Sequence, residues 1–265
     1  MALGWFGLFN NLVREKAGMS TFEICVDSVE GTLAAQRAGA DRVELCAGLF
    51  EGGLTPSIGT IELALRHAEQ IRVHVLVRPR GGDFIYSPYE VDAMVRDVQA
   101  AVTVGAHGVV IGALTPEGDL DLPTMRRLLA AADGASVTFH RAFDMVRDPF
   151  EALEQLIELG IPRVLTSGQE ETALAGAPLI ADLVGKAAGR IAVMAGGGIN
   201  ERNIARIVAA TGADEYHFTA RVSADGPAVH RNPVPRMGGV LSRSEYQRSE
   251  TSPERIGQII GAVRR

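Results

Sequence analysis

Two cysteines and a cluster of charged residues carry most of the chemistry that this sequence can offer. Cys25 and Cys46 lie in the segments "FEICVD" and "RVELC", where polar and apolar residues alternate. A third segment, "TFHRAFD", brings His140, Arg141 and Asp144 within five residues of one another where a short apolar run ends. Thiols favour soft metal ions, and imidazole and carboxylate groups serve as acids and bases. Which chemistry they perform depends on the elements that position them.

A repeated pattern of helix, glycine and strand runs along the chain. Gly39, Gly105, Gly160 and Gly212 each end a helical pattern and precede a β-rich segment, as expected for glycine just after a helix. Strands are predicted at 22–26, 42–45, 72–77, 108–111, 136–139, 163–166, 191–194 and 215–218. Eight such units in about 250 residues predict an α/β fold, a single (β/α)8 TIM-type barrel. A doubly wound open sheet is the alternative.

The composition of the chain restricts the kinds of partner that it could bind and the compartment in which it could work. The chain has 265 residues and a net charge of −6, which argues against a nucleic-acid partner. No apolar run reaches the ~18 residues of a membrane span. Two cysteines are too few for a secreted disulfide framework, so we expect a reducing, cytoplasmic setting. Barrels of this kind often associate, so a homo-oligomer is an open alternative to a monomer.

We place the barrel domain at residues 20–265, and residues 1–19 form an N-terminal extension that we expect to be poorly ordered. The extension begins with apolar residues and continues with charged ones, which is the reverse of a secretory signal. The segment 219–252 is long and rich in Arg, Pro and Gly. Loops beyond ~12–15 residues are usually functional or disordered, and this one could cover the barrel mouth.

Alternation along the predicted strands separates an apolar face from a polar one. In a barrel, one set of alternate residues packs on the helices and the other points inward. The polar set, which we expect to converge inside the barrel, is Glu23, Cys25, Glu44, Cys46, His74, Arg78 and His140. Arg141 and Asp144 should lie at the rim of the C-terminal face, where barrel active sites are built. The alternative is a structural ion-pair network, although buried ion pairs are a costly way to stabilise a core.

A glycine-rich loop predicts a site for a small anion. The segment "MAGGGINERNI" places Gly196, Gly197 and Gly198 between the seventh strand and a helix. Exposed backbone N–H groups at such a position favour phosphate or carboxylate. Arg80 and Arg141 are the arginines that we expect to bind the same kind of anion. A tight turn without a ligand is the alternative.

The polar residues at this end of the barrel could also catalyse proton transfer. The candidate catalytic residues are Glu23, Glu44, His74, Arg78, His140 and Asp144. Neither lysine, Lys16 or Lys186, lies at a predicted strand end, so a Schiff-base mechanism is not expected. Acid–base chemistry remains, such as isomerase or lyase action on a small phosphorylated or carboxylated substrate.

Several segments, taken together and in order, resemble the CutC family of copper homeostasis proteins. They are "ELCAGLFEGGLTPSIG", "VRPRGGDFIYS", "TFHRAFD", "RVLTSG" and "AGGGI". The resemblance runs from about Phe22 to the last helix. It implies a TIM-type barrel in a cytoplasmic protein of copper handling, with Cu(I) bound by a cysteine pair that by position is Cys25 and Cys46. The sequence departs from the family in "HFTARV", where a serine near His217 is more usual, so residues 217–220 have no assigned role.

The predicted geometry permits a copper site between the two cysteines. They fall on consecutive strands with the same inward parity, and adjacent strands lie about 4.7–4.9 Å apart. Two metal–sulfur bonds of roughly 2.3 Å span about 4.6 Å, so a linear Cu(I) bridge is feasible if the residues are level. His74 could add a ligand. A buried thiol with a packing role and a disulfide are the alternatives, and Cu(I) binding and enzyme action remain two separate hypotheses.

Overall fold

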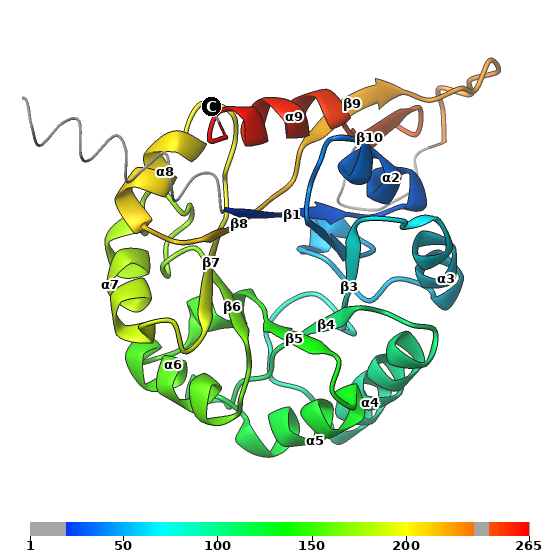
Figure 1. The fold of residues 1–265 in the computed structure, drawn as a ribbon. Coiled ribbons are helices and arrows are strands. Elements are labelled where there is room, and N and C mark those ends of the chain that lie inside the picture. The colour runs from blue at the N-terminus through cyan, green and yellow to red at the C-terminus, as the bar shows by residue number, and fades with distance from the viewer. Residues whose placement is uncertain (1–19, 236–243, 265) are drawn as a thin grey trace, which may run out of the picture.

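Eight parallel strands close into a barrel in the order of the sequence (Figure 1). The computed structural model describes residues 20–235 and 244–264, so the predicted N-terminal extension lies outside the described residues. The strands are β1 (Thr21–Val26), β2 (Arg42–Leu45), β3 (Arg72–Leu76), β4 (Gly108–Ile111), β5 (Ser136–Phe139), β6 (Arg163–Thr166), β7 (Ala192–Gly196) and β8 (Glu215–Phe218). Pairing of β1 with β8 closes the sheet, which confirms the barrel and excludes the open sheet.

Helices follow the strands and surround the barrel in a ring (Figure 1). They are α2 (Val29–Arg37), α3 (Ile58–His67), α4 (Pro88–Thr103), α5 (Leu122–Ala132), α6 (Pro149–Glu158), α7 (Ala177–Ala187), α8 (Ile204–Thr211) and α9 (Pro253–Gly261), with short 3₁₀ turns η1 (Leu49–Glu51) and η2 (Arg141–Met145). Local sequence explains where they begin: Ser87 and Glu90 form a capping box at α4, and Asp148 accepts two backbone N–H bonds at α6. Such caps satisfy donors that a helix start leaves unpaired.

The alternation of polar and apolar residues along the strands produces two separate apolar regions. The large one lies between the barrel and the helices and contains the outward-facing strand residues, such as Phe22, Ile24 and Val43. The small one lies inside the barrel and consists of Cys25, Cys46, Leu76 and Val110. Burying each large outer side chain stabilises the fold by about 1.5–3 kcal/mol. The structure therefore confirms which side chains of β1 and β2 were predicted to face the helices and which the barrel interior.

Ion pairs fill the end of the barrel interior that lies below the cysteines. The Arg42 guanidinium contacts both Glu23 and Glu215, at 2.6 Å from the Glu215 carboxylate. Arg163 also pairs with Glu215 and donates to Thr138. The structural ion-pair network considered above therefore exists in this layer. It holds Glu23, which is fully buried, at the boundary with the layer above.

A two-stranded hairpin follows the last barrel strand. Its strands β9 (Arg221–Asp225) and β10 (Gln247–Thr251) are antiparallel, and it extends outward past α2 and α9 rather than across the barrel (Figure 1). Of the hairpin residues that the structure describes, Arg221 and Ser249 line the pocket at the barrel mouth. Residues 236–243 lie outside the described part. Across the described residues, no helix has the length and hydropathy needed to cross a membrane.

Candidate functional site

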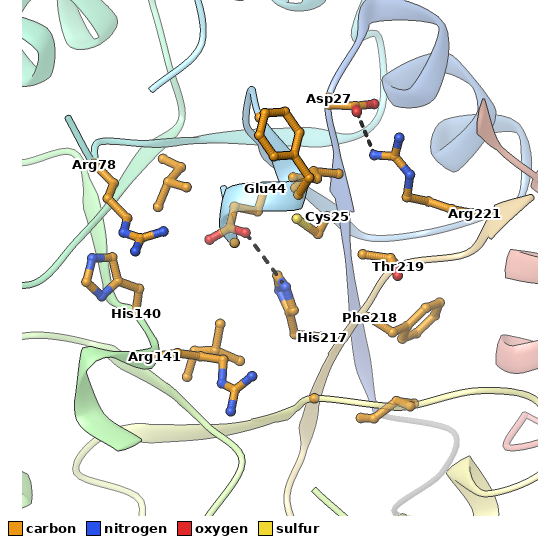
Figure 2. Close-up of a pocket in the computed structure, with 18 of the residues that line it drawn as sticks. Cys25, Asp27, Glu44, Arg78, His140, Arg141, His217, Phe218, Thr219 and Arg221 are labelled. Carbon is orange, nitrogen blue, oxygen red and sulfur yellow. Dashed lines mark hydrogen bonds and ion pairs between the residues drawn. The ribbon is translucent and has the colours of Figure 1, made fainter. Parts of the chain in front are cut away.

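A pocket of about 540 Å³ opens at the C-terminal ends of the barrel strands (Figure 2). Its volume lies within the range of small-molecule sites in proteins. The polar residues that line it come from most of the barrel: Cys25, Asp27, Glu44, Arg78, His140, Arg141, His217, Thr219, Arg221 and Ser249, together with Gly197 and Gly198. This is the face at which TIM-type barrels place their active sites.

The two cysteines meet at the floor of this pocket. Their Sγ atoms lie 3.5 Å apart, and the Sγ of Cys46 lies 3.4 Å from a carboxylate oxygen of Glu44. Both thiols are free. The strand register pairs Cys25 with Glu44, so the two cysteines are not level, although their sulfur atoms converge. Cys25 lines the pocket, whereas Cys46 is only 1% exposed.

His217 lies between the cysteines and the lower ion-pair layer, and the sequence analysis gave it no role. Its Nδ1 lies 2.7 Å from Glu23. Its Nε2 lies 3.7 Å from Glu44 (Figure 2). Its interaction with Cys25 helps to raise the pKa of His217. The signal was present in "EYHF", where Glu215 and His217 alternate with two aromatic residues. Strand parity applied to β8 would have placed His217 inside the barrel.

Burial and mutual contact shift the pKa values of this cluster in opposite directions. Burial opposes ionisation of Glu23, but the Arg42 charge and the hydrogen bond from His217 lower its pKa well below the usual range. Burial likewise disfavours the imidazolium, yet the Glu44 carboxylate, Cys25 and Glu23 raise the pKa of His217. We therefore assign an ionised Glu23 beneath a cationic His217.

The three other acidic groups of the cluster, Cys25, Cys46 and Glu44, differ in how readily they lose a proton. The hydrogen bond with Cys46, opposed by burial and assisted by His217, lowers the pKa of Cys25 to about 5. Burial and the Cys25 charge raise the pKa of Cys46 and that of Glu44. Near neutral pH the floor thus holds a thiolate at Cys25 and a proton on Cys46. A thiolate is the form of cysteine that binds metals and acts as a nucleophile.

Arg78 and His140 lie side by side on another wall of the pocket (Figure 2). The Arg78 guanidinium donates to three backbone carbonyls, those of Glu51, Gly53 and Gly82. His140 Nδ1 accepts a hydrogen bond from the Ala142 N–H, so its proton lies on Nε2. Burial lowers the pKa of His140 to about 3, which keeps the ring neutral.

Other predicted site residues lie outside the pocket. Asp144 accepts hydrogen bonds from the Thr166 hydroxyl at 2.5 Å and the Ser167 N–H at 2.9 Å, and thereby fixes the turn after β6. Arg80 pairs with Glu90 at the start of α4. His74 is buried in the barrel interior, and burial lowers its pKa to about 3. Gly196 ends β7, and only the two glycines after it reach the pocket wall.

Comparison with known proteins identifies relatives of this chain. The CutC family profile matches residues 20–222. A family protein CutC of Bacteroides thetaiotaomicron is 53% identical over 92% of this chain and 98% of its own length. A human copper homeostasis protein cutC homolog is 49% identical over 91% of this chain and 89% of its own.

Solved structures agree with these sequence relatives. A CutC structure from Streptococcus agalactiae aligns with a TM-score of 0.73 at 35% identity, covering 76% of this chain and 98% of that one. A phosphoribosylanthranilate isomerase from Thermotoga maritima aligns with a TM-score of 0.54 at 12% identity, over 92% of this chain and 98% of its own. The second likeness shows the barrel fold alone.

Proposed function

Because this chain belongs to the CutC family, we propose that it acts in copper homeostasis by binding Cu(I) inside its barrel through Cys25 and Cys46. One observation carries the proposal: two buried sulfur atoms and a carboxylate oxygen of Glu44 all lie within 4.8 Å of one another. Thiolate sulfur is the ligand type that selects Cu(I) over harder ions. Copper is the cargo in this proposal, not a resident catalytic group.

The spacing of the two sulfur atoms suits a bent or three-coordinate site better than a linear one. Metal–sulfur bonds of about 2.3 Å would set the sulfur atoms roughly 4.6 Å apart in a linear site and about 4.0 Å apart in a trigonal one. The observed 3.5 Å needs only a small side-chain rotation to reach the trigonal value. Glu44 is the neighbouring group that could supply the third ligand.

Charge in the cluster also supports Cu(I). Cys25 already carries the thiolate, so binding requires the loss of one proton, from Cys46. Two thiolates and one Cu(I) ion carry a net charge of −1, and the cationic His217 lies in contact with Cys25. The imidazolium would therefore balance the charge of the loaded site.

An anaerobic Cu(I) titration against a competing chelator tests the proposal. The variants are Cys25→Ser and Cys46→Ser, and these are the two cysteines of the chain. Met145→Leu is the matched control, because it removes an exposed sulfur far from the pair. We expect one tightly bound ion in wild type and Met145→Leu, and weak binding in both cysteine variants. Equal affinity in all four proteins would refute the assignment.

A second candidate function is acid–base catalysis on a small phosphorylated or carboxylated substrate. The observation that favours it is the size of the pocket, about 540 Å³, which far exceeds what one metal ion needs. Glu44, whose pKa is raised by burial and by the Cys25 charge, and His217 supply two groups for proton transfer at the pocket floor. This arrangement suits an isomerase or a lyase.

Incorporation of solvent deuterium tests this second candidate. Wild-type protein is incubated with a small-metabolite extract in D₂O, and mass spectrometry follows deuterium uptake at carbon. Proton transfer to carbon by the enzyme predicts uptake into one or a few metabolites, which Glu44→Gln abolishes. Glu154→Gln, an exposed carboxylate paired with Arg190, is the control. If deuterium uptake with wild-type protein is no greater than in a sample without protein, this chemistry is excluded.

A further inference from the structure

We propose that the barrel mouth binds a small organic molecule with two acceptor groups at opposite ends. A carboxylate or carbonyl group would lie against Arg78 and His140, and a phosphate or second carboxylate against Arg141 and the Gly197–Gly198 loop. The inference rests on the second candidate function, for which it names the ligand class. It does not depend on copper binding by the cysteines.

Arg78 is the first reason to expect an anion. The residue is 7% exposed, and its guanidinium forms no ion pair with any residue in the described ranges 20–235 and 244–264. Its partners are neutral backbone carbonyls, and its Nε has no hydrogen-bond partner. A buried cation is costly unless a negative charge compensates it. A ligand carboxylate at Nε would provide that charge.

His140 supplies a second donor beside the first. The side chain is 4% exposed, and its Nε2, which carries the proton, is buried without a partner. Both Arg78 and His140 pack at 5.0 Å from the ring centroid of Phe84, and both line the pocket. Burying a donor without a hydrogen-bond partner is unfavourable. One acceptor group bound here would satisfy two such donors.

The other end of the proposed ligand site lies at the loop after β7. Gly197 and Gly198 have φ values of 106° and 68°, and neither backbone N–H donates to a residue that the structure describes. Arg141 donates through Nε to Asp144 and through Nη2 to Ser167. Its remaining nitrogen, Nη1, lies 3.6 Å from where a Cβ on Gly197 would stand. These N–H donors line one side of the pocket, and backbone N–H groups beside an arginine nitrogen are donors of the kind that bind phosphate.

The order of strands places the two groups of donors on opposite sides of the mouth. Arg78 follows β3 and the glycine loop follows β7, and these strands are four places apart in a closed barrel of eight. His140 and Arg141 follow β5, between them. The floor groups Cys25, Glu44 and His217 lie toward the centre of the pocket in Figure 2. A molecule that spans both ends would therefore cross the acid–base cluster.

The charges of the side chains at the barrel mouth also favour an organic anion there over a bare metal ion. Arg221 is neutralised by Asp27, at 2.5 Å, whereas Arg78 has no such partner among the described residues. An unpaired guanidinium repels Cu(I) and attracts an anion. The two ligand types thus occupy different parts of the pocket: sulfur at the floor for the metal, and nitrogen donors at the walls for the anion.

Calorimetric titration with three defined probes tests the inference: inorganic phosphate, phosphoglycolate and 3-phosphoglycerate. The last two carry a phosphate and a carboxylate at different separations. We expect at least one of them to bind at least about tenfold more tightly than phosphate, because a charged hydrogen bond contributes about 1.5–3 kcal/mol. Arg141→Gln should weaken all bound probes about tenfold.

His140→Asn isolates the other end of the site, because the Asn side-chain oxygen can still accept from the Ala142 N–H. It should weaken the two-ended probes and leave inorganic phosphate unchanged. The matched control is Arg147→Gln, an exposed arginine that pairs with Asp119 as Arg141 pairs with Asp144. It should change nothing.

Two outcomes would overturn the inference: no probe binding below about 10 mM, which corresponds to less than 3 kcal/mol, or binding that Arg141→Gln and His140→Asn leave unaltered. The variant with both Cys25→Ser and Cys46→Ser separates this result from the copper proposal. It should keep probe binding while losing Cu(I). Deuterium uptake at carbon without probe binding would refute the ligand class and leave the acid–base candidate standing.

Discussion

Replacing Glu23 by Gln tests how the ion-pair layer holds the site. The Glu23 carboxylate is fully buried and contacts the cations Arg42 and His217. Removing one partner of a buried ion pair costs about 3–5 kcal/mol, because the remaining charge is left uncompensated. With roughly 2–4 °C of midpoint shift per kcal/mol for a domain of this size, the unfolding midpoint should fall by about 6–20 °C.

The pH dependence of this effect follows from the sign of the shift. The pKa of Glu23 is lower in the folded protein than in the unfolded chain. Its contribution to stability is therefore fully present above the unfolded pKa of about 4.3 and is lost as pH falls toward the folded value. The stability difference between wild type and Glu23→Gln should shrink as pH falls below about 4.

Thermal unfolding followed by circular dichroism at a series of pH values measures both effects. Glu154→Gln is the matched control, because Glu154 pairs with Arg190 at the surface and exposed pairs contribute about 0–1 kcal/mol. A fall in the Glu23→Gln midpoint no larger than that of the control would refute the reasoning. So would a stability difference that is independent of pH.

Two further predictions concern the pocket itself. Iodoacetamide should alkylate Cys25 rather than Cys46 in the copper-free protein. The rate should fall below about pH 5, because contact with Cys46 and His217 lowers the pKa of Cys25. Peptide mapping that finds Cys46 modified first would contradict this prediction. Gly112→Ala should displace His140, because the added Cβ would lie 2.5 Å from its ring. We expect the free energy of unfolding, measured with denaturant, to fall by about 1–3 kcal/mol. An unchanged unfolding midpoint would show that the ring is free to move.

Local alternation was sufficient to predict the barrel and much of its interior. Strand parity depends only on neighbouring residues, so "FEICVD" and "RVELC" were enough to place Glu23, Cys25, Glu44 and Cys46 inside. His217 carries the same kind of signal in "EYHF", where it alternates with aromatic residues as Glu215 does. The ion-pair partner of Glu23, Arg42, begins the strand that carries Glu44.

Long-range partners explain what the sequence could not supply. Asp144 was expected as a catalytic residue at the barrel rim and Arg80 as an anion-binding residue, yet the Ser167 turn and Glu90 engage them instead. Those partners lie on other elements than Asp144 and Arg80 do, so no local sequence pattern predicts the contacts. A linear Cu(I) bridge was feasible only if the two cysteines were level, whereas the register offsets Cys46 from Cys25 by two residues. Only the closed barrel shows that their sulfur atoms still converge.

X-ray absorption at the copper edge of the Cu(I)-loaded protein tests the central claim most directly. The account predicts two sulfur ligands at about 2.3 Å in wild type and one in Cys46→Ser. Copper surrounded only by nitrogen and oxygen, or a spectrum that neither cysteine substitution alters, would contradict a copper site between Cys25 and Cys46.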